Sequence, residues 1–148
     1  MPHQTKTIVM LRQLASFHRT TIEQLGRDSV RRAFCGIGAM PEEILKIHAL
    51  CRDGLNDILH HFGIDPYGSK PRGQDILKRG GFGPTFPIGP ANLTTTVGIT
   101  HWYTDMIRCY RELLGSGTVP IRAESGVRMN LLSMEALALD IKSEMPAH

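Results

Sequence analysis

The sequence predicts a mainly α-helical protein with four longer helices and one short helix, packed as a compact bundle or an orthogonal helical domain. Apolar residues recur at steps of three and four in several separate segments, which is the period of an amphipathic helix. Glycine and proline gather instead between about residues 63 and 99 and predict a long crossover between the third and fourth helices. A length of 148 residues suits a single helical domain over 1–148.

The first helix is predicted over about residues 6–25, where a histidine, His18, falls inside the apolar stripe. Such a histidine is expected to be hydrogen-bonded in the core rather than catalytic. A short helix over about 28–35 follows, with Asp28 or Ser29 as its N-cap.

The third helix, over about residues 40–62, has the strongest boundary signals in the chain. Pro41 suits the first helical position because its missing N–H needs no partner there. Glu42 and Glu43 suit the positive end of the helix dipole, and Gly63 suits a left-handed cap after the last turn. These signals predict a well-defined helix in the middle of the fold.

After the crossover, residues 93–97 are rich in β-formers and suggest a short strand without an evident partner. Thr100 is then a plausible cap for a helix over 101–114. Residues 118–122 should be extended, because they include Pro120.

Ser125 is expected to cap the last helix, which runs to about residue 145 with apolar residues in a 4-3-4-3-4 rhythm. Further leucines widen this apolar surface beyond one seam: Leu132, Leu137 and Leu139. A widened apolar surface on a terminal helix indicates burial in the bundle or a second partner. Self-association of the chain as a homo-oligomer, such as a homodimer, through this helix is therefore expected.

The composition limits the kinds of partner, metal site and cellular location that we expect for the chain. The net charge of +3 and pI near 8.9 are compatible with an anionic partner without requiring one. Three cysteines without CxxC spacing argue against a disulfide framework and a zinc site. The N-terminus lacks a signal-peptide pattern, and no apolar run is long enough to cross a membrane, so a cytoplasmic location and no membrane partner are expected.

Residues 28–47 resemble a helix-turn-helix arrangement, in which two helices meet at a tight turn and the second enters the DNA major groove. Gly38 would supply the turn, and Phe34 and Ile44 would pack the two helices together. The cations assigned to nucleic-acid binding here are Arg27, Arg31 and Arg32 for phosphates and Lys46 for an approach to a base. Against this hypothesis, the second helix begins with carboxylates, which repel a duplex.

A basic, glycine-rich loop over 70–83 is a second candidate for phosphate or single-strand binding. Its cations are Lys70, Arg72, Lys78 and Arg79. The loop lacks the GxxxxGK[ST] order of a phosphate-binding loop, and a solvated charged loop is the simpler interpretation.

Metal and nucleophilic chemistry are disfavoured. His48, Cys51, Asp57, His60 and His61 lie along the third helix, but their spacing offers no matched set of ligands, so no metal or other cofactor is expected. Cys51 and Cys109 lie among apolar residues and should be buried, inert thiols. Cys35 should be exposed, because it lies at a helix end.

We therefore expect a non-enzymatic helical binding or regulatory protein, with nucleic acid as its leading ligand and a role in transcription regulation as one possibility. The alternative is an assembly or adaptor protein that docks a protein partner through the Gly/Pro-rich segment, using Phe82, Phe86 and Ile88 as apolar anchors. A small-molecule enzyme with His48 and His101 as acid–base residues is the third hypothesis.

Overall fold

The structure, a computed structural model, describes residues 2–63 and 91–143 and confirms the predicted fold class. Four longer helices and one short helix form the described part of the chain. They are α1 (Pro2–Gln24), α2 (Asp28–Gly36), α3 (Pro41–His61), α5 (Thr96–Gly115) and α6 (Ile121–Ser143). The predicted crossover falls largely outside the described residues, because 64–90 are not part of them.

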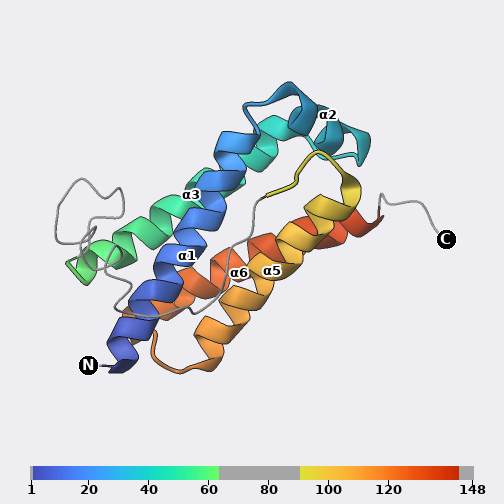
Figure 1. Cartoon of the computed structure of the whole chain (residues 1–148). Coiled ribbons are helices and arrows are strands. Elements are labelled where there is room, and N and C mark those ends of the chain that lie inside the picture. The colour runs from blue at the N-terminus through green and yellow to red at the C-terminus, as the bar shows by residue number, and fades with distance from the viewer. Residues whose placement is uncertain (1, 64–90, 144–148) are drawn as a thin grey trace.

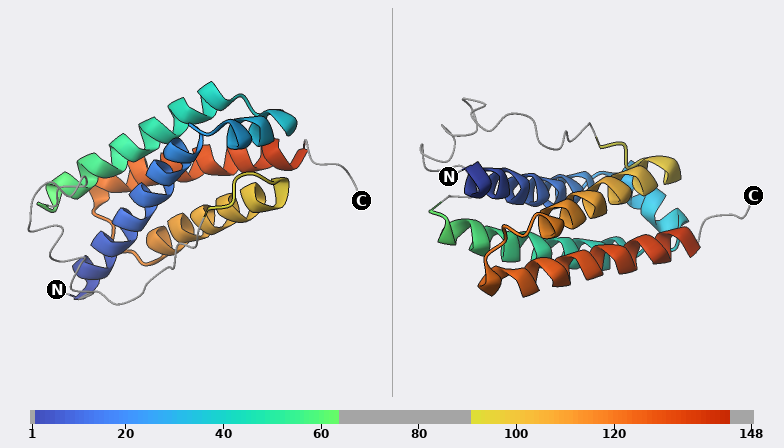
Figure 2. Two further views of the ribbon diagram at one scale, coloured as in Figure 1. Left: turned by 45° about the horizontal axis from the view of Figure 1, so that its top comes forward. Right: turned by 90° about the horizontal axis from the view of Figure 1, so that it is seen from below.

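The four longer helices pack as a bundle in which each has two neighbours (Figures 1 and 2). α1 packs most extensively on α3, and α5 on α6; contacts of α1 with α5 and of α3 with α6 close the arrangement. Figure 1 shows that neighbouring helices run antiparallel and that α5 begins at the end of the bundle where α2 lies. α3 ends at the opposite end of the bundle.

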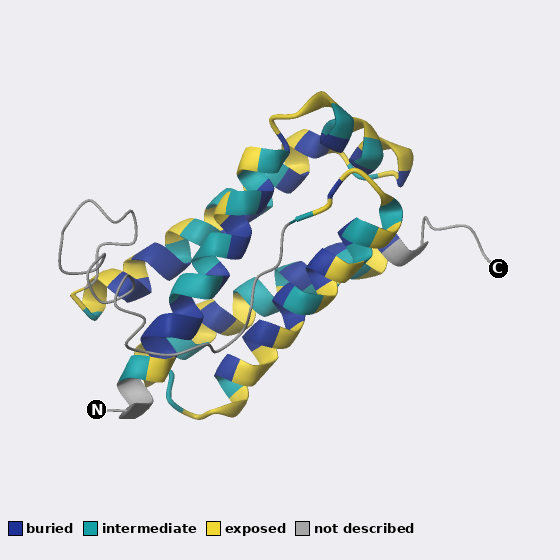
Figure 3. Ribbon diagram, viewed as in Figure 1, coloured by how far each residue is buried: buried dark blue, intermediate teal, exposed yellow. Residues whose placement is uncertain are grey.

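One hydrophobic core fills the space between the helices, as the inward dark-blue faces in Figure 3 show. Its largest fully buried side chains include Phe17, Phe34 and Tyr110. Trp102 packs its ring edge-on against Phe17 at a centroid distance of 4.8 Å. Its indole N–H donates a 2.8 Å hydrogen bond to Thr21 Oγ1, so this buried polar group is satisfied.

The best-signalled helix boundaries are confirmed. Pro41 is the first residue of α3, and its first turn carries the two predicted glutamates. Gly63 follows the helix with a φ of +76°, the left-handed conformation that favours glycine. The cap of α2 was predicted wrongly, because Arg27 occupies the N-cap position and makes no side-chain capping bond.

The starts of the last two helices also differ from expectation. Residues 93–97 do not form a strand; Thr95 caps α5, and its Oγ1 accepts a hydrogen bond from the Gly98 N–H. The helix therefore begins four residues before the predicted cap at Thr100. α6 begins at Ile121 instead of near Ser125, because the Pro120 carbonyl accepts hydrogen bonds from the N–H groups of the first turn. A proline just before a helix is compatible with it, since it needs to supply only its carbonyl.

Candidate functional site

The most concentrated polar chemistry in the described residues is a chain of hydrogen bonds through the middle of the bundle. His18 of α1 and His48 of α3 are both fully buried, and their Nδ1 atoms lie 2.8 Å apart. Each histidine points into the bundle because it lies on the same face of its helix as residues of the core. The histidine pair thus connects the two helices that pack most extensively.

The hydrogen-bonded chain continues into α5 at both ends. His18 Nε2 lies 2.5 Å from the Tyr110 hydroxyl, and His48 Nε2 lies 2.7 Å from the Tyr103 hydroxyl. Both tyrosines are buried. Three of the four bundle helices therefore contribute side chains to one polar network, which we call the histidine–tyrosine network (His18, His48, Tyr103 and Tyr110).

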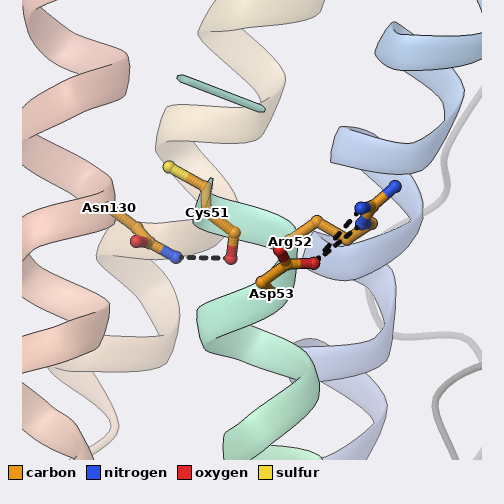
Figure 4. A network of polar contacts seen from close by, with 4 residues as sticks. All are labelled: Cys51, Arg52, Asp53 and Asn130. Atoms are coloured by element: carbon orange, nitrogen blue, oxygen red, sulfur yellow. Dashed lines mark hydrogen bonds and ion pairs between the residues drawn. The ribbon is translucent and has the colours of Figure 1, made fainter. Parts of the chain in front are cut away.

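Asn130 connects the fourth helix, α6, to this network. Its Nδ2 donates one 3.1 Å hydrogen bond to the Tyr110 hydroxyl and another to the backbone carbonyl of Cys51. Figure 4 shows the bond from Asn130 to Cys51, together with the Arg52–Asp53 ion pair on the adjacent part of α3. A carbonyl can only accept, so the atom that faces it must be the amide nitrogen, which fixes the orientation of the Asn130 side chain.

The network requires the two imidazoles to be different tautomers. One Nδ1 must carry the shared proton and the other must accept it, because two neutral rings facing each other cannot both donate. The ring that donates through Nδ1 has a bare Nε2, which accepts from its tyrosine. The other ring carries its proton on Nε2 and donates it to its own tyrosine. One imidazole is thus protonated on Nδ1 and the other on Nε2.

Burial holds both histidines in the neutral form. Removal from water lowers the pKa of His48 from 6.5 to about 3. The pKa of His18 is lowered well below its usual range, first by burial and then by the charges of His48 and Arg52. Burial also raises the pKa values of the Tyr103 and Tyr110 hydroxyls. At neutral pH all four groups are therefore uncharged hydrogen-bonding partners.

The expectation that His18 is a hydrogen-bonded core residue is confirmed. The hypothesis that gave His48 an acid–base role gains no support, because the side chain is sealed from solvent and held between two partners. His101, its proposed companion, lies exposed on α5. Sequence reasoning missed the pairing of the two histidines because they are 30 positions apart and meet only when α1 and α3 pack; their places on apolar helix faces were the one available signal.

The residues assigned to nucleic-acid binding that the structure describes lie around the corner between α2 and α3. Gly38 makes the turn with a φ of +78°, and Phe34 and Ile44 are buried on either side of it. Arg27 and Arg32 are exposed. We call this region, residues 27–47, the α2–α3 corner.

Acidic side chains engage two of the four cations in the α2–α3 corner. Arg31 forms a salt bridge with Glu42 and also donates to the Leu25 carbonyl. Lys46 lies 3.8 Å from a carboxylate oxygen of Glu43. With Asp28, three carboxylates accompany the four cations, and one net positive charge remains.

The other predicted binding residues lie outside the described part of the chain. They are the loop cations Lys70, Arg72, Lys78 and Arg79 and the apolar anchors Phe82, Phe86 and Ile88. The hypotheses that rest on these residues stay predictions.

The cysteines lie as predicted. Cys35 is exposed, whereas Cys51 and Cys109 are buried free thiols. Burial raises the pKa of each buried thiol to about 12, so neither forms a nucleophilic thiolate near neutral pH. Within the described residues, no three His, Cys, Asp or Glu side chains are grouped closely enough to hold a metal ion.

A shallow groove of about 580 Å³ lies between α5 and α6. Its rim carries Arg108 and Arg111, and these pair with Asp105 and Glu135, respectively. Tyr103 contributes to the wall but is only 1% exposed, and its hydroxyl is bonded to His48. The groove therefore does not open the histidine–tyrosine network to solvent.

Comparison of the chain with protein-family models, curated proteins and solved structures finds no match. Among residues 2–63 and 91–143, no helix combines the length and the apolar character needed to cross a membrane.

Proposed function

We propose that this chain is a non-enzymatic helical binding protein that acts through its outer surface. The observation that carries this proposal is the closed histidine–tyrosine network. Its strongly shifted pKa values come from burial, and its ring nitrogens are bonded to one another or to tyrosines. An acid–base catalyst must instead reach a substrate proton. Groups arranged in this way stabilise the bundle and leave its surface for recognition.

As the ligand we propose nucleic acid, contacted through its phosphates by the α2–α3 corner. Two features support this choice: the glycine turn that sets α2 against α3, and two exposed arginines, Arg27 at the N-cap of α2 and Arg32 within α2. Glu42 and Glu43 at the start of α3 oppose entry of that helix into a groove, because carboxylates repel the duplex. The proposal therefore predicts weak, sequence-independent binding that depends strongly on salt.

The test is fluorescence anisotropy with labelled random duplex and single strands at 50 and 200 mM salt. The variant Arg27→Ala/Arg32→Ala should weaken binding and reduce the slope of log K against log salt by up to about 2. Arg108→Ala is the matched control, because this exposed arginine lies on α5 and should leave binding unchanged. No binding, or binding that the double variant leaves intact, would reject the corner as a nucleic-acid interface.

We also propose that two copies of the chain associate through α6. Seven large apolar side chains are exposed among the described residues, and four of them lie on this one helix. A concentration of exposed apolar side chains on one element is typical of an association surface. Self-association is tested by sedimentation of the full chain over 1–500 µM. Leu132→Asp should abolish it, whereas Leu50→Asp, at a leucine on α3 that is even more exposed, should not.

A further inference from the structure

The outward face of α6 carries a regular seam of apolar and small side chains. Four are large and highly exposed: Ile121 (90%), Met129 (66%), Leu132 (64%) and Leu139 (68%). The small exposed residues Ser125 and Ala136 fill the gaps between them. These six residues, the outer seam, follow steps of 4, 4, 3, 4 and 3, the spacing by which one helix packs along another.

The outer seam lies opposite the face that α6 buries in its own bundle. Val127, Met134 and Ile141 belong to that inner face and are buried in the core. At 3.6 residues per turn, the two sets of residues lie on opposite sides of the helix. α6 is thus apolar on two faces, of which its own fold uses one.

Charged residues border the outer seam in opposite-sign pairs. Arg128 and Glu135 lie along one edge of the seam, and Arg122 and Asp140 lie along the other. Arg128 and Glu135 also pair within the chain, with Glu124 and Arg111, respectively, and stay solvent-accessible there. Such edge positions decide the orientation of paired helices.

We propose that two copies of this chain pair antiparallel along the outer seam. The twofold axis lies between the two α6 helices, at the level midway between Asn130 and Leu131. This inference rests on the proposed self-association through α6 and assigns its geometry. A twofold axis there places Met129 opposite the partner's Leu132. Ser125 comes opposite the partner's Ala136 in the same way, and Ile121 comes within one residue of the partner's Leu139.

The same axis brings opposite charges together. In an antiparallel pair, each edge of the seam faces the same edge of the other copy. Arg122 therefore meets the partner's Asp140 within one residue of exact register, and Arg128 meets the partner's Glu135 within two residues. A parallel pair would bring opposite edges together and make like charges the nearest neighbours. Charge complementarity thus selects the antiparallel arrangement.

The length of the outer seam determines how tightly two copies are expected to bind. α6 has 23 residues and is about 34 Å long. A single helix face of this length is at the small end of specific interfaces, so dimerisation should have a dissociation constant in the micromolar range.

Cross-linking of the full chain distinguishes the two orientations. In a Cys35→Ser background, chains with Ser125→Cys and chains with Ala136→Cys should form a disulfide with each other when mixed. Ser125→Cys alone should form none, because its two copies lie about 16 Å apart along an antiparallel pair. A Ser125→Cys disulfide formed without the second variant would show a parallel pair and overturn the inference.

Charge reversal gives an independent readout. Arg122→Asp and Asp140→Arg should each weaken dimerisation by about threefold to tenfold, and the double variant should restore it. Restoration requires these two positions to face each other, so a double variant as weak as the singles contradicts the register. If sedimentation finds no dimer at any concentration, the proposed self-association itself is wrong. If a dimer forms but these register tests fail, only the antiparallel geometry is wrong.

Discussion

The Nδ1 atoms of His18 and His48 face each other at 2.8 Å in the middle of the bundle, and one proton must serve both. Neither ring reaches solvent, and each uses its second nitrogen on a tyrosine of α5. The pair therefore connects α1, α3 and α5 by hydrogen bonds, which depend on direction. Apolar side chains at these positions would only have to fill the same volume. A fully satisfied buried network of this kind favours one arrangement of helices over others.

The first prediction concerns pH. Both histidines have lower pKa values in the folded protein than the ordinary value near 6.5, so the unfolded chain binds more protons once the pH falls below that value. The contribution of these two histidines to stability is therefore complete above about pH 6.5 and is lost as the pH falls below that value, for His48 down to its folded-state pKa of about 3. The loss can reach about 1.4 kcal/mol per pH unit for each histidine. Urea unfolding at pH 7.5, 6.0 and 5.0 measures it, and a free energy of unfolding that stays constant across this range contradicts buried neutral histidines.

The second prediction concerns removal of one member of the pair. His48→Ala removes the hydrogen-bond partner of His18 Nδ1 and of the Tyr103 hydroxyl, and it opens a cavity between α1 and α3. We expect a loss of about 3 kcal/mol or more in the free energy of unfolding. His60→Ala is the control on the same helix, because His60 is exposed and its removal should change stability by less than about 0.5 kcal/mol. Equal effects of the two variants would show that the network does not stabilise the fold.

The third prediction compares the two tyrosines. Tyr110→Phe removes the partner of His18 Nε2 and one of the two partners of Asn130 Nδ2, whereas Tyr103→Phe removes only the partner of His48 Nε2. The loss of stability should be larger for Tyr110→Phe by about 1 kcal/mol, the usual effect of one further unsatisfied group. Denaturant unfolding of the two variants, which change the same atom in the same helix, provides the comparison. A larger loss for Tyr103→Phe would contradict the bonding pattern.

Residue periodicity could predict the helices, but not how they meet. The apolar stripe of α3 with Pro41 and Gly63 at its ends gave correct boundaries, because these signals are local. The start of α5 was missed, since Gly98 breaks the helical pattern in the sequence but lies inside the first turn of the helix. Two histidines on two apolar faces were visible in the sequence. That they meet depends on the relative rotation of α1 and α3, which packing of the whole core decides.

The fourth prediction follows from Gly98. A Cβ at this position would lie 1.8 Å from the Asn92 carbonyl oxygen, so the loop before α5 can approach the helix only if the residue is glycine. Gly98→Ala should destabilise the protein by more than about 1 kcal/mol and lower its melting temperature. Gly54→Ala is the opposite case, because a Cβ there meets nothing within 4 Å and alanine favours a helix by about 1 kcal/mol. The two melting temperatures should shift in opposite directions, and shifts in the same direction would contradict the packing of this loop.

The most direct test of the buried, neutral histidine pair is the ¹⁵N NMR spectrum of the imidazole nitrogens between pH 8 and pH 5. We predict that His18 and His48 stay neutral throughout, with one ring protonated on Nδ1 and the other on Nε2. Titration of either buried ring with an ordinary pKa near 6.5, or the same tautomer in both rings, would contradict the hydrogen-bonded pair and reopen the interior as a site of acid–base chemistry.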